Sequence, residues 1–336
     1  MRPNKRDHPG LKDILPKNIS KIIHHPFMNI TRHSYCPVCH QWPAEIWSEA
    51  RDFEYFSSEN EYVYFNCPGC GTIFTDPLPA DQLNVIYPSN YYSYVPGSKG
   101  WVFMIKEWLD LRLFRKILKK IKGDSINILD AGGGTGWIMD VLKKTDKRIK
   151  LTQVVDIDEK AGDVAIEKGH AYFEGRIEDF ESENRFDLIL MLNLIEHVAD
   201  PEELLRKVLT LLTPDGIVLL KTPQTRSLDA RLFRNSYWGG LHCPRHWTIF
   251  SEESIRIVVE RVGFKVDKLR YTQGGPFWAF SLIILLARKN WLNTSKARPV
   301  IFHPLFPILS AFFAAFDFLR SPFSRTSQIF ISIKSK

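Results

Sequence analysis

Ile126-Asn-Ile-Leu-Asp-Ala-Gly-Gly-Gly-Thr-Gly136 is the stretch that decides the fold of this 336-residue chain. Its apolar run predicts a strand, and the glycine turn that follows opens the next helix. A nucleotide-type ligand must approach such a turn closely, so we expect Gly132, Gly134 and Gly136 to provide clearance by lacking Cβ atoms. A dinucleotide site would need the same kind of loop, so the glycines alone do not choose the ligand.

From Ile126 onward, short apolar runs alternate with helical stretches. This alternation predicts an α/β fold, a Rossmann-like parallel sheet with helices on both faces. Asp200 is the expected N-cap of one helix, with Pro201 in its first position, and Ser251 is the expected N-cap of another that stops at Gly263. The expected strands are 126–129, 151–155, 186–192, 216–220, 264–271 and 328–334, and the expected helices are 136–144, 159–168, 201–212 and 252–262.

Two acids at strand ends favour a cationic nucleotide ligand over a dinucleotide. Asp130 ends the strand before the first glycine, where a carboxylate can hold the amino group of a cationic ligand. Asp156 ends the next apolar run, in Val154-Val-Asp-Ile-Asp158, where it is placed to accept hydrogen bonds from two ribose hydroxyls.

Residues 126–272 resemble a class I S-adenosylmethionine-dependent methyltransferase, in the branch of ubiquinone-biosynthesis and sugar methyltransferases. The motifs that carry the resemblance are the Leu129–Gly136 loop, Phe186-Asp-Leu-Ile-Leu-Met-Leu-Asn-Leu-Ile-Glu-His-Val-Ala-Asp-Pro201 and Leu212-Thr-Pro-Asp-Gly-Ile-Val218. The resemblance implies a seven-stranded methyltransferase sheet and S-adenosylmethionine as the cofactor.

The same resemblance implies a set of cofactor-binding residues. Asp130 would face the methionine part and Asp156 the ribose, whereas Arg176 stands where the family often has an acid. The full expected set is Asp130, Gly132, Gly134, Gly136, Asp156, Ile157, Glu178 or Asp179 beside the adenine, and Asn193 after the fourth strand.

The segment Tyr237-Trp-Gly-Gly-Leu-His-Cys-Pro-Arg-His-Trp-Thr-Ile-Phe250 is expected on the acceptor side. Methyl transfer is an in-line displacement helped by positioning, and a hydroxyl acceptor must also lose its proton. An imidazole can remove that proton, so His246 and His242 are the catalytic candidates, with His246 favoured by a Pro-Arg-His block that many relatives carry. Arg245 is expected to hold an anionic group of the acceptor, and Tyr237 to contact it. The alternative for His246 is a hydrogen bond to a strand end.

Glu196 and His197 follow the fourth strand and have two interpretations, a role in the site or a brace for the loop. The preceding Asn193-Leu-Ile differs from the Asn/Asp-Pro-Pro-aromatic block that marks methylation of an amino group on a base. We therefore expect a hydroxyl acceptor.

Four of the five cysteines form two pairs, Cys36-Pro-Val-Cys39 and Cys67-Pro-Gly-Cys70. Two such knuckles supply four thiolates in a tetrahedron, which predicts a structural Zn²⁺ with no open position for catalysis. The module resembles the N-terminal zinc-binding domain of certain sugar methyltransferases, and also zinc ribbons that touch RNA.

The net charge of +7 suits an anionic partner but does not choose one. The basic residues are scattered and no aromatic-basic motif appears, which argues against nucleic acid. The expected acceptor is a small molecule, a sugar or a lipid-linked glycan, methylated at a hydroxyl. The alternative is an RNA methyltransferase whose zinc ribbon holds RNA. A non-catalytic zinc protein is disfavoured by the intact glycine loop.

A hydrophobic helical insertion, residues 276–322, precedes the last strand. Its two apolar runs are flanked by basic residues, a layout that suits helices lying in a membrane interface. A hydrophobic lid or a dimer surface fits equally well. Prolines and Asp317 argue against a spanning helix.

The expected organisation has four parts: a flexible basic arm (1–32), a zinc-ribbon-like module (33–75), a linker and amphipathic helix (76–122), and a methyltransferase domain (123–336). Residues 1–15 lack the apolar core of a signal peptide, so a cytoplasmic protein is expected, with peripheral membrane contact as an option.

Overall fold

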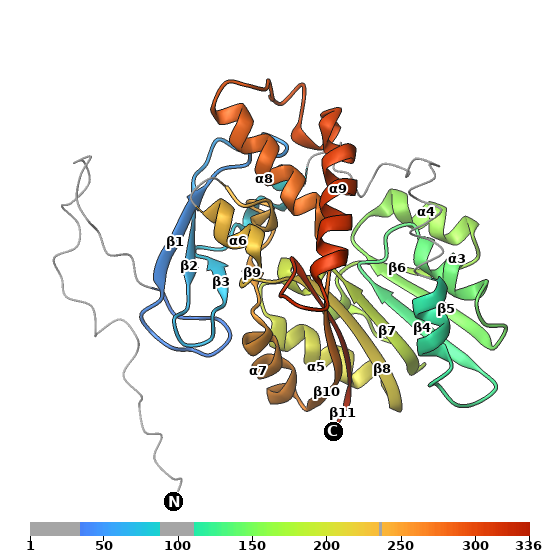
Figure 1. The fold of residues 1–336 in the computed structure, drawn as a ribbon. Coiled ribbons are helices and arrows are strands. Elements are labelled where there is room, and N and C mark those ends of the chain that lie inside the picture. Colours follow the sequence, from blue (N-terminus) through green and yellow to red (C-terminus); the bar gives the residue numbers. More distant parts are fainter. Residues whose placement is uncertain (1–33, 88–110, 235–236) are drawn as a thin grey trace, which may run out of the picture. The chain divides into compact units, whose positions relative to one another are not determined.

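The strands that alternate with helices from Ile126 onward form a seven-stranded sheet in the order β10-β11-β8-β7-β4-β5-β6 (Figure 1). The computed structural model describes residues 34–87, 111–234 and 237–336, all within one compact unit. The strands are β4 (Ile126–Ala131), β5 (Ile149–Asp156), β6 (Ala171–Glu174), β7 (Phe186–Leu192), β8 (Leu212–Pro223), β10 (Phe264–Thr272) and β11 (Gln328–Ser335).

Strands β4 to β8 pair in parallel, whereas β11 runs antiparallel to both of its neighbours, β8 and β10. This is the Rossmann-like methyltransferase sheet that was expected. The short edge strand β6 has no counterpart among the predicted strands, because its side chains are partly or fully exposed and leave no apolar run.

Two core clusters lie on the two faces of the sheet. On β4, Ile128 belongs to one cluster and Leu129 to the other, as the alternation of side chains along a strand requires. Helices α5 (Pro201–Leu211) and α7 (Glu252–Val262) supply apolar side chains to the Leu129 cluster, and α3 (Trp137–Lys143) and residues 111–121 supply them to the Ile128 cluster. The predicted helices on both faces are confirmed.

The predicted helix caps are confirmed in detail. The Asp200 carboxylate accepts hydrogen bonds from the amides of Glu202 and Glu203 at 2.8 and 3.0 Å. Ser251 caps α7 through a reciprocal pair of hydrogen bonds with Ser254. Helices α4 (Glu159–Glu167) and α6 (Leu228–Phe233) complete this region, and α6 was not expected from the sequence.

A second, four-stranded antiparallel sheet has the order β1-β2-β3-β9. Strands β1 (Glu45–Ala50), β2 (Tyr62–Asn66) and β3 (Ile73–Thr75) come from the cysteine module, as expected for its short aromatic runs. Strand β9 (Thr248–Ile249) comes from the end of the predicted acceptor segment and pairs with β3. The cysteine module and the acceptor segment therefore share one sheet. A short helix, α1 (Leu83–Ile86), follows this module.

The insertion before the last strand folds as two helices, α8 (Gly275–Arg288) and α9 (Leu305–Arg320), which pack on each other (Figure 1). Within the described ranges, no helix has both the length and the hydrophobicity needed to cross a bilayer. The predicted arm 1–32, most of the Pro/Tyr-rich linker and the start of the amphipathic helix lie outside the described residues. Residues 111–118 of that helix are described, and they are helical.

Candidate methyl-transfer site

The glycine loop lies at the carboxyl end of β4, between β5 and β7. Gly132, Gly134 and Gly136 all have positive φ, at 75°, 52° and 67°, a conformation that other L-residues rarely adopt. Among the described residues, no atom lies within 4 Å of where a Cβ atom on Gly134 would be, so the described structure leaves space beside it for a ligand. A Cβ on Gly132 would lie 3.3 Å from Leu194, in the loop after β7.

Gly136 also has a structural reason to lack a side chain. A Cβ atom there would lie 2.6 Å from Cδ2 of His170, a side chain of the protein and not a ligand. His170 is held on both sides, by the Thr152 hydroxyl at 2.9 Å and the Asp140 carboxylate at 3.0 Å. Clearance for the cofactor is thus expected at Gly134, while Gly136 accommodates the packing between α3 and its neighbours.

Asp130 is a buried carboxyl group, 2% exposed, at the end of β4. Its Oδ2 atom has no hydrogen-bond partner among the described residues. Burial, together with the nearby Asp156 carboxylate, raises the pKa of Asp130 to about 8. A buried acid without a partner is costly in the ligand-free chain, and an ammonium group beside it would supply the missing charge and hydrogen bonds.

Asp156 ends β5 and is held by the backbone. Its carboxylate accepts hydrogen bonds from the amides of Gly134, at 2.8 Å, and Asp158, at 3.1 Å. Burial raises its pKa, and these amide contacts oppose that shift. Ile157, the next residue, exposes more than half of its side chain. A fixed carboxylate beside an exposed apolar side chain suits a ribose next to an aromatic base.

The other expected cofactor residues lie on neighbouring elements. Glu178 and Asp179 lie in a short 3-10 helix, Ile177–Asp179, after β6, and Glu178 forms an ion pair with Arg176 at 3.2 Å. Arg176, which stands where the family often has an acid, therefore neutralises Glu178, one of the two candidate acids. Asn193 follows β7 with a positive φ of 60°, and its Oδ1 atom accepts a hydrogen bond from Gln328 at 3.2 Å.

Glu196, His197 and His246 form a compact polar group beyond the end of β7. One side-chain oxygen or nitrogen from each lies within 4.8 Å of the others. The Nδ1 atom of His246 is 2.8 Å from the Gly240 carbonyl, which can only accept, so Nδ1 carries the proton and Nε2 keeps its lone pair. That Nε2 atom lies 3.9 Å from Glu196. Trp247 joins the two segments by donating its amide to the Glu196 carbonyl at 2.7 Å.

The electrostatics of this group favour uncharged side chains. Glu196 is completely buried, neither carboxylate oxygen has a hydrogen-bond partner among the described residues, and burial raises its pKa to about 8. Burial and the neighbouring His197 and His242 rings lower the pKa of His246 well below its ordinary value. Burial also lowers the pKa of His197 to about 3. His246 is therefore neutral near pH 7, as a proton acceptor must be.

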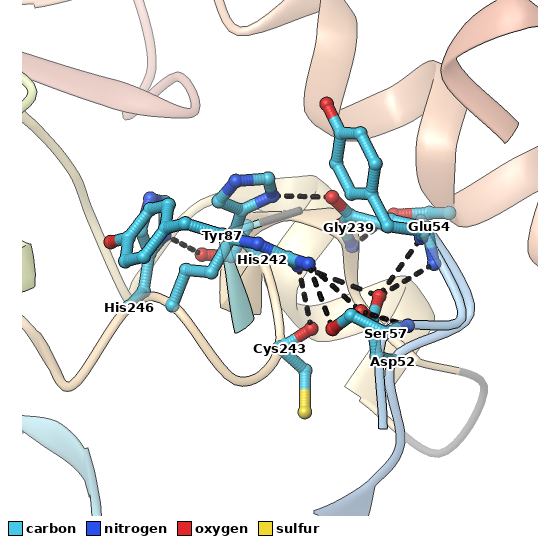
Figure 2. A network of polar contacts seen from close by, with 12 residues as sticks. Asp52, Glu54, Ser57, Tyr87, Gly239, His242, Cys243 and His246 are labelled. Atoms are coloured by element: carbon cyan, nitrogen blue, oxygen red, sulfur yellow. Dashed lines mark hydrogen bonds and ion pairs between the residues drawn. The ribbon is translucent and has the colours of Figure 1, made fainter. Parts of the chain in front are cut away.

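His242 and Arg245 contact residues of the cysteine module: Figure 2 shows His242 beside Glu54, and Arg245 pairs with Asp52. The Arg245 side chain is fully buried, with its NH2 atom 2.8 Å from the Asp52 carboxylate, and its guanidinium lies over the Tyr55 ring. His242 forms a short contact with the buried Glu54 carboxylate. The expectation that Arg245 holds an anionic acceptor group does not agree with this geometry, because its charge is already matched by Asp52. His242 is likewise engaged by Glu54.

Tyr237 lies apart from the histidine group. Its ring packs against Phe53, with centroids 4.6 Å apart, and the Arg288 guanidinium lies over it at 4.7 Å. The apolar helix α8 is nearer to the histidines, since the Phe277 ring meets His246 edge-on at 6.4 Å and the Phe280 ring lies 6.3 Å from His242. Apolar side chains therefore cover one side of this group.

The four predicted metal ligands meet in one cluster. The Cys36 and Cys70 sulfurs are 3.6 Å apart, those of Cys39 and Cys67 are 3.4 Å apart, and all four lie within 4.8 Å of one another. Tetrahedral Zn²⁺ with bonds of about 2.3 Å would separate its sulfurs by about 3.8 Å, so the cluster is compatible with zinc. Burial raises the pKa of the Cys39 thiol to about 11, a cost that a divalent cation would offset.

Asp52 and Glu54 are the polar residues that sequence reasoning does not find. They lie in Arg51-Asp-Phe-Glu-Tyr55, whose mixture of charged and aromatic residues has no spacing typical of a site. Their partners, His242 and Arg245, are 188 and 193 positions away. Glu196 did carry a signal, its place after the fourth strand, but only the fold brings His246 beside it.

Comparison with known proteins agrees with this geometry. The model of a family described as "Methyltransferase domain" matches residues 101–269, half of the chain, so the chain belongs to this family. Ubiquinone biosynthesis O-methyltransferase of Azorhizobium caulinodans is 30% identical over 114 residues, which cover 31% of this chain and 42% of that protein. The protein of the same name from Rhodopseudomonas palustris strain TIE-1 is 29% identical over 107 residues, covering 30% and 40%.

The chain thus spans about two fifths of the length of the curated relatives it matches. Among solved structures, it is similar to coclaurine N-methyltransferase bound to N-methylheliamine and S-adenosylhomocysteine. The sequence identity is 16% and the TM-score 0.49, and the match covers 76% of this chain and 81% of that one. Strand order and family membership together define the chain as a member of the methyltransferase domain family with a Rossmann-like sheet.

Proposed function

We propose that this protein transfers a methyl group from S-adenosylmethionine to a hydroxyl of a small-molecule acceptor, with His246 as the general base. The acceptor is a sugar, a lipid-linked glycan or a quinone-like ring. The observation that carries the proposal is the neutral His246, with its Nε2 lone pair beside buried Glu196. The loop after β7, which contains Glu196, also approaches the glycine loop through Leu194.

The cofactor is proposed to bind along the carboxyl ends of β4 and β5. The buried Asp130 would pair with the ammonium group of the methionine part, and Asp156 would accept hydrogen bonds from the ribose hydroxyls. Ile157 would pack on the adenine, with Asp179 or Glu178 at its edge and Asn193 lining the pocket. Gly134 leaves open space beside the backbone for the ligand.

The acceptor hydroxyl is proposed to lose its proton to Nε2 of His246 as its oxygen attacks the methyl carbon. S-adenosylmethionine, when held by Asp130 and Asp156, would supply an activated methyl group and would be released as S-adenosylhomocysteine, with the electron pair of the broken bond on its sulfur. Glu196, ionised above its pKa of about 8, would stabilise the imidazolium that forms. Phe277 and Phe280 of α8 border the histidines, which favours an acceptor with an apolar ring or lipid part.

Zinc is proposed to have a structural role, held by Cys36, Cys39, Cys67 and Cys70. With four thiolates the metal keeps no open position, so it would bind no substrate. Its site is joined to the methyltransferase region by Ser251, whose hydroxyl donates to the Cys70 carbonyl at 2.6 Å, and by Thr225, which donates to the Gly71 carbonyl at 2.7 Å. A cytoplasmic location is proposed for the enzyme.

The test begins with mass spectrometry of extracts from cells that lack the protein. One glycan, lipid or quinone-like species should become lighter by a methyl group, and the purified protein should remethylate it with isotopically labelled S-adenosylmethionine. His246→Ala should lower kcat by about 10²–10⁴ and leave cofactor affinity unchanged. His303→Ala, a histidine of the α8–α9 insertion, is the control and should keep full activity.

Two outcomes would contradict this proposal. If the parent chain fails to bind S-adenosylmethionine in calorimetry, the methyl-transfer function itself is wrong. If the species that lacks a methyl group is a tRNA or rRNA, and binding to it weakens steeply with salt, the acceptor is RNA and not a small molecule.

A further inference from the structure

Helix α9 carries a row of exposed apolar side chains that nothing in the described structure covers. Ile308, Phe312 and Leu319 are 64%, 64% and 73% exposed. Together with Leu305 and Ala315 they recur every three or four positions, which puts them on one side of the helix. Every exposed residue between positions 305 and 319 is apolar. A continuous face of this kind marks a docking surface.

The opposite side of α9 packs against α8. Phe313 stacks on Trp278 of α8 with ring centroids 4.8 Å apart, and Phe306 lies 4.6 Å from Phe280. The one acid of the helix, Asp317, is fully buried, where it accepts hydrogen bonds from the Gly274 amide and the Ser327 hydroxyl. Helix α9 therefore buries its one acidic side chain and exposes an apolar face.

The surroundings of this face are basic. From Lys268 to Lys336 the sequence has ten Lys and Arg residues, and Asp317 is its only acid. Four of these ten residues lie on or just after strands β10 and β11, and the other six belong to the segment Arg288–Arg325 that contains α9. In that segment the exposed basic residues before and after α9 are Arg288, Lys289, Lys296, Arg298 and Arg325. A second copy of the chain would bring the same positive charge to such an interface and be repelled, whereas an anionic lipid surface would be attracted.

We propose that α9 docks the protein on the surface of an anionic membrane. The 16-residue helix, about 24 Å long, lies parallel to the bilayer with its apolar face among the acyl chains near the headgroups. The basic residues contact the lipid phosphates. Trp291, shortly after α8, and Phe323, shortly after α9, are both exposed, and their rings lie at headgroup depth, where aromatic rings are favoured.

Membrane docking would also bring the catalytic groups close to lipid. Helix α8 packs between α9 and the acceptor segment, where the Ser281 hydroxyl accepts the Gly239 amide at 2.8 Å. An acceptor with a lipid part could then reach His246 while its tail stays in the bilayer. Docking itself does not depend on methyl transfer, so the two proposals can fail separately.

Cosedimentation of the purified full chain with lipid vesicles tests the proposal. The protein should pellet with vesicles that contain phosphatidylglycerol, and much less with vesicles of phosphatidylcholine alone or at high salt. Replacing Ile308, Phe312 and Leu319 together by Ser should lower the partition coefficient by at least about tenfold, since each substitution removes a large apolar group that the docked helix buries in the bilayer. Lys296→Glu with Arg298→Glu should lower it too.

Ile166→Ser is the matched control, because Ile166 is 59% exposed on α4 and belongs to a different part of the chain. This control should pellet like the parent. Circular dichroism and S-adenosylmethionine binding should be unchanged in every variant, which separates lost docking from lost folding or lost methyltransferase function. The proposal is overturned if the parent chain stays in the supernatant, or if the triple variant pellets as the parent does. It is also overturned if the same substitutions instead dissociate a dimer in analytical ultracentrifugation, since a second copy would then cover the face.

Discussion

At the scale of single residues, the proposed chemistry depends most on two side chains, Asp130 and Glu196. Each is a carboxyl group buried at the carboxyl edge of the sheet, and burial raises the pKa of each to about 8. Asp130 is conspicuous in the sequence because it stands two positions before the first glycine of the loop. Glu196 is not, since its burial and its distance of 3.9 Å from His246 depend on a segment 50 positions away.

Binding of S-adenosylmethionine should strengthen as the pH rises toward 8. Below that pH the Asp130 carboxyl is protonated in the ligand-free chain, so it must release a proton before it pairs with an ammonium group. The affinity should rise by up to about tenfold per pH unit between pH 6 and 8, and level off above. Calorimetry across this range measures the slope, and Asp130→Asn should bind weakly with no slope.

The stability of the ligand-free chain supplies the control for this prediction. The pKa of Asp130 is higher in the folded chain than in the unfolded chain, so the group weakens the fold as the pH rises from about 4 to about 8. Asp130→Asn should therefore raise the Tm of the ligand-free protein at pH 8, while Asp215→Asn, at an exposed position, should not. An unchanged pH slope of cofactor binding in Asp130→Asn would show that another group titrates.

At the scale of elements, local signals predict most helices and strands well. Helix α7 begins and ends where its Ser251 cap and Gly263 stop predict, and β7 has the predicted bounds Phe186–Leu192. Strand β8 is longer than expected because its ends pair with neighbouring strands. The start of α3 shows the limit of such local signals. The sequence predicts that Gly136 must lack a side chain, but it does not show that the His170 ring occupies the space of a Cβ atom there.

Gly136→Ala should destabilise the protein more than Gly169→Ala. Both glycines have positive φ, 67° and 78°, so either alanine adds about 1–2 kcal/mol of backbone strain. A Cβ at Gly169 meets no atom of the described residues within 4 Å, whereas one at Gly136 meets the His170 ring, which adds about 1–3 kcal/mol. Urea denaturation measures both free energies of unfolding. Equal losses for the two variants would mean that the ring moves aside at no cost.

At the scale of the whole molecule, the cysteine module supports the proposed acceptor side. Strand β9 completes its sheet, the Asp52–Arg245 pair joins the two at 2.8 Å, and Glu54 contacts His242. Breaking a buried ion pair leaves an uncompensated charge, so these contacts tie the acceptor segment to the module. Zinc is therefore expected to affect the acceptor site more than the cofactor site, which lies on the central sheet.

Removing the metal should show that the acceptor site depends on the cysteine module. Elemental analysis should find one zinc per chain, and Cys67→Ser or treatment with a chelator should lower the Tm by about 10 °C, as the loss of several kcal/mol implies. Tryptophan emission should shift, because Trp47 and Trp238 pack edge to face with ring centroids 6.0 Å apart. Calorimetry should show S-adenosylmethionine binding within about twofold of the parent while methyl transfer is lost.

Cys243→Ser is the matched control for metal removal, since Cys243 is buried but lies outside the cluster. It should keep the zinc and the tryptophan emission of the parent. A chelated protein with an unchanged Tm, or one that loses cofactor and acceptor functions together, would contradict the separation of the two sites.

The sequence by itself determined the class of this protein, because its signals are local. The strand, the glycine turn and the acids at positions 130 and 156 lie within about 30 positions of one another, and cysteine spacing predicts a metal cluster in the same way. Only the tertiary structure decided that Arg245 is matched by Asp52, that His246 lies beside Glu196, and that no described residue covers one face of α9. These facts depend on contacts between distant segments, and a charge or an apolar side chain looks the same in the sequence whether it is buried or exposed.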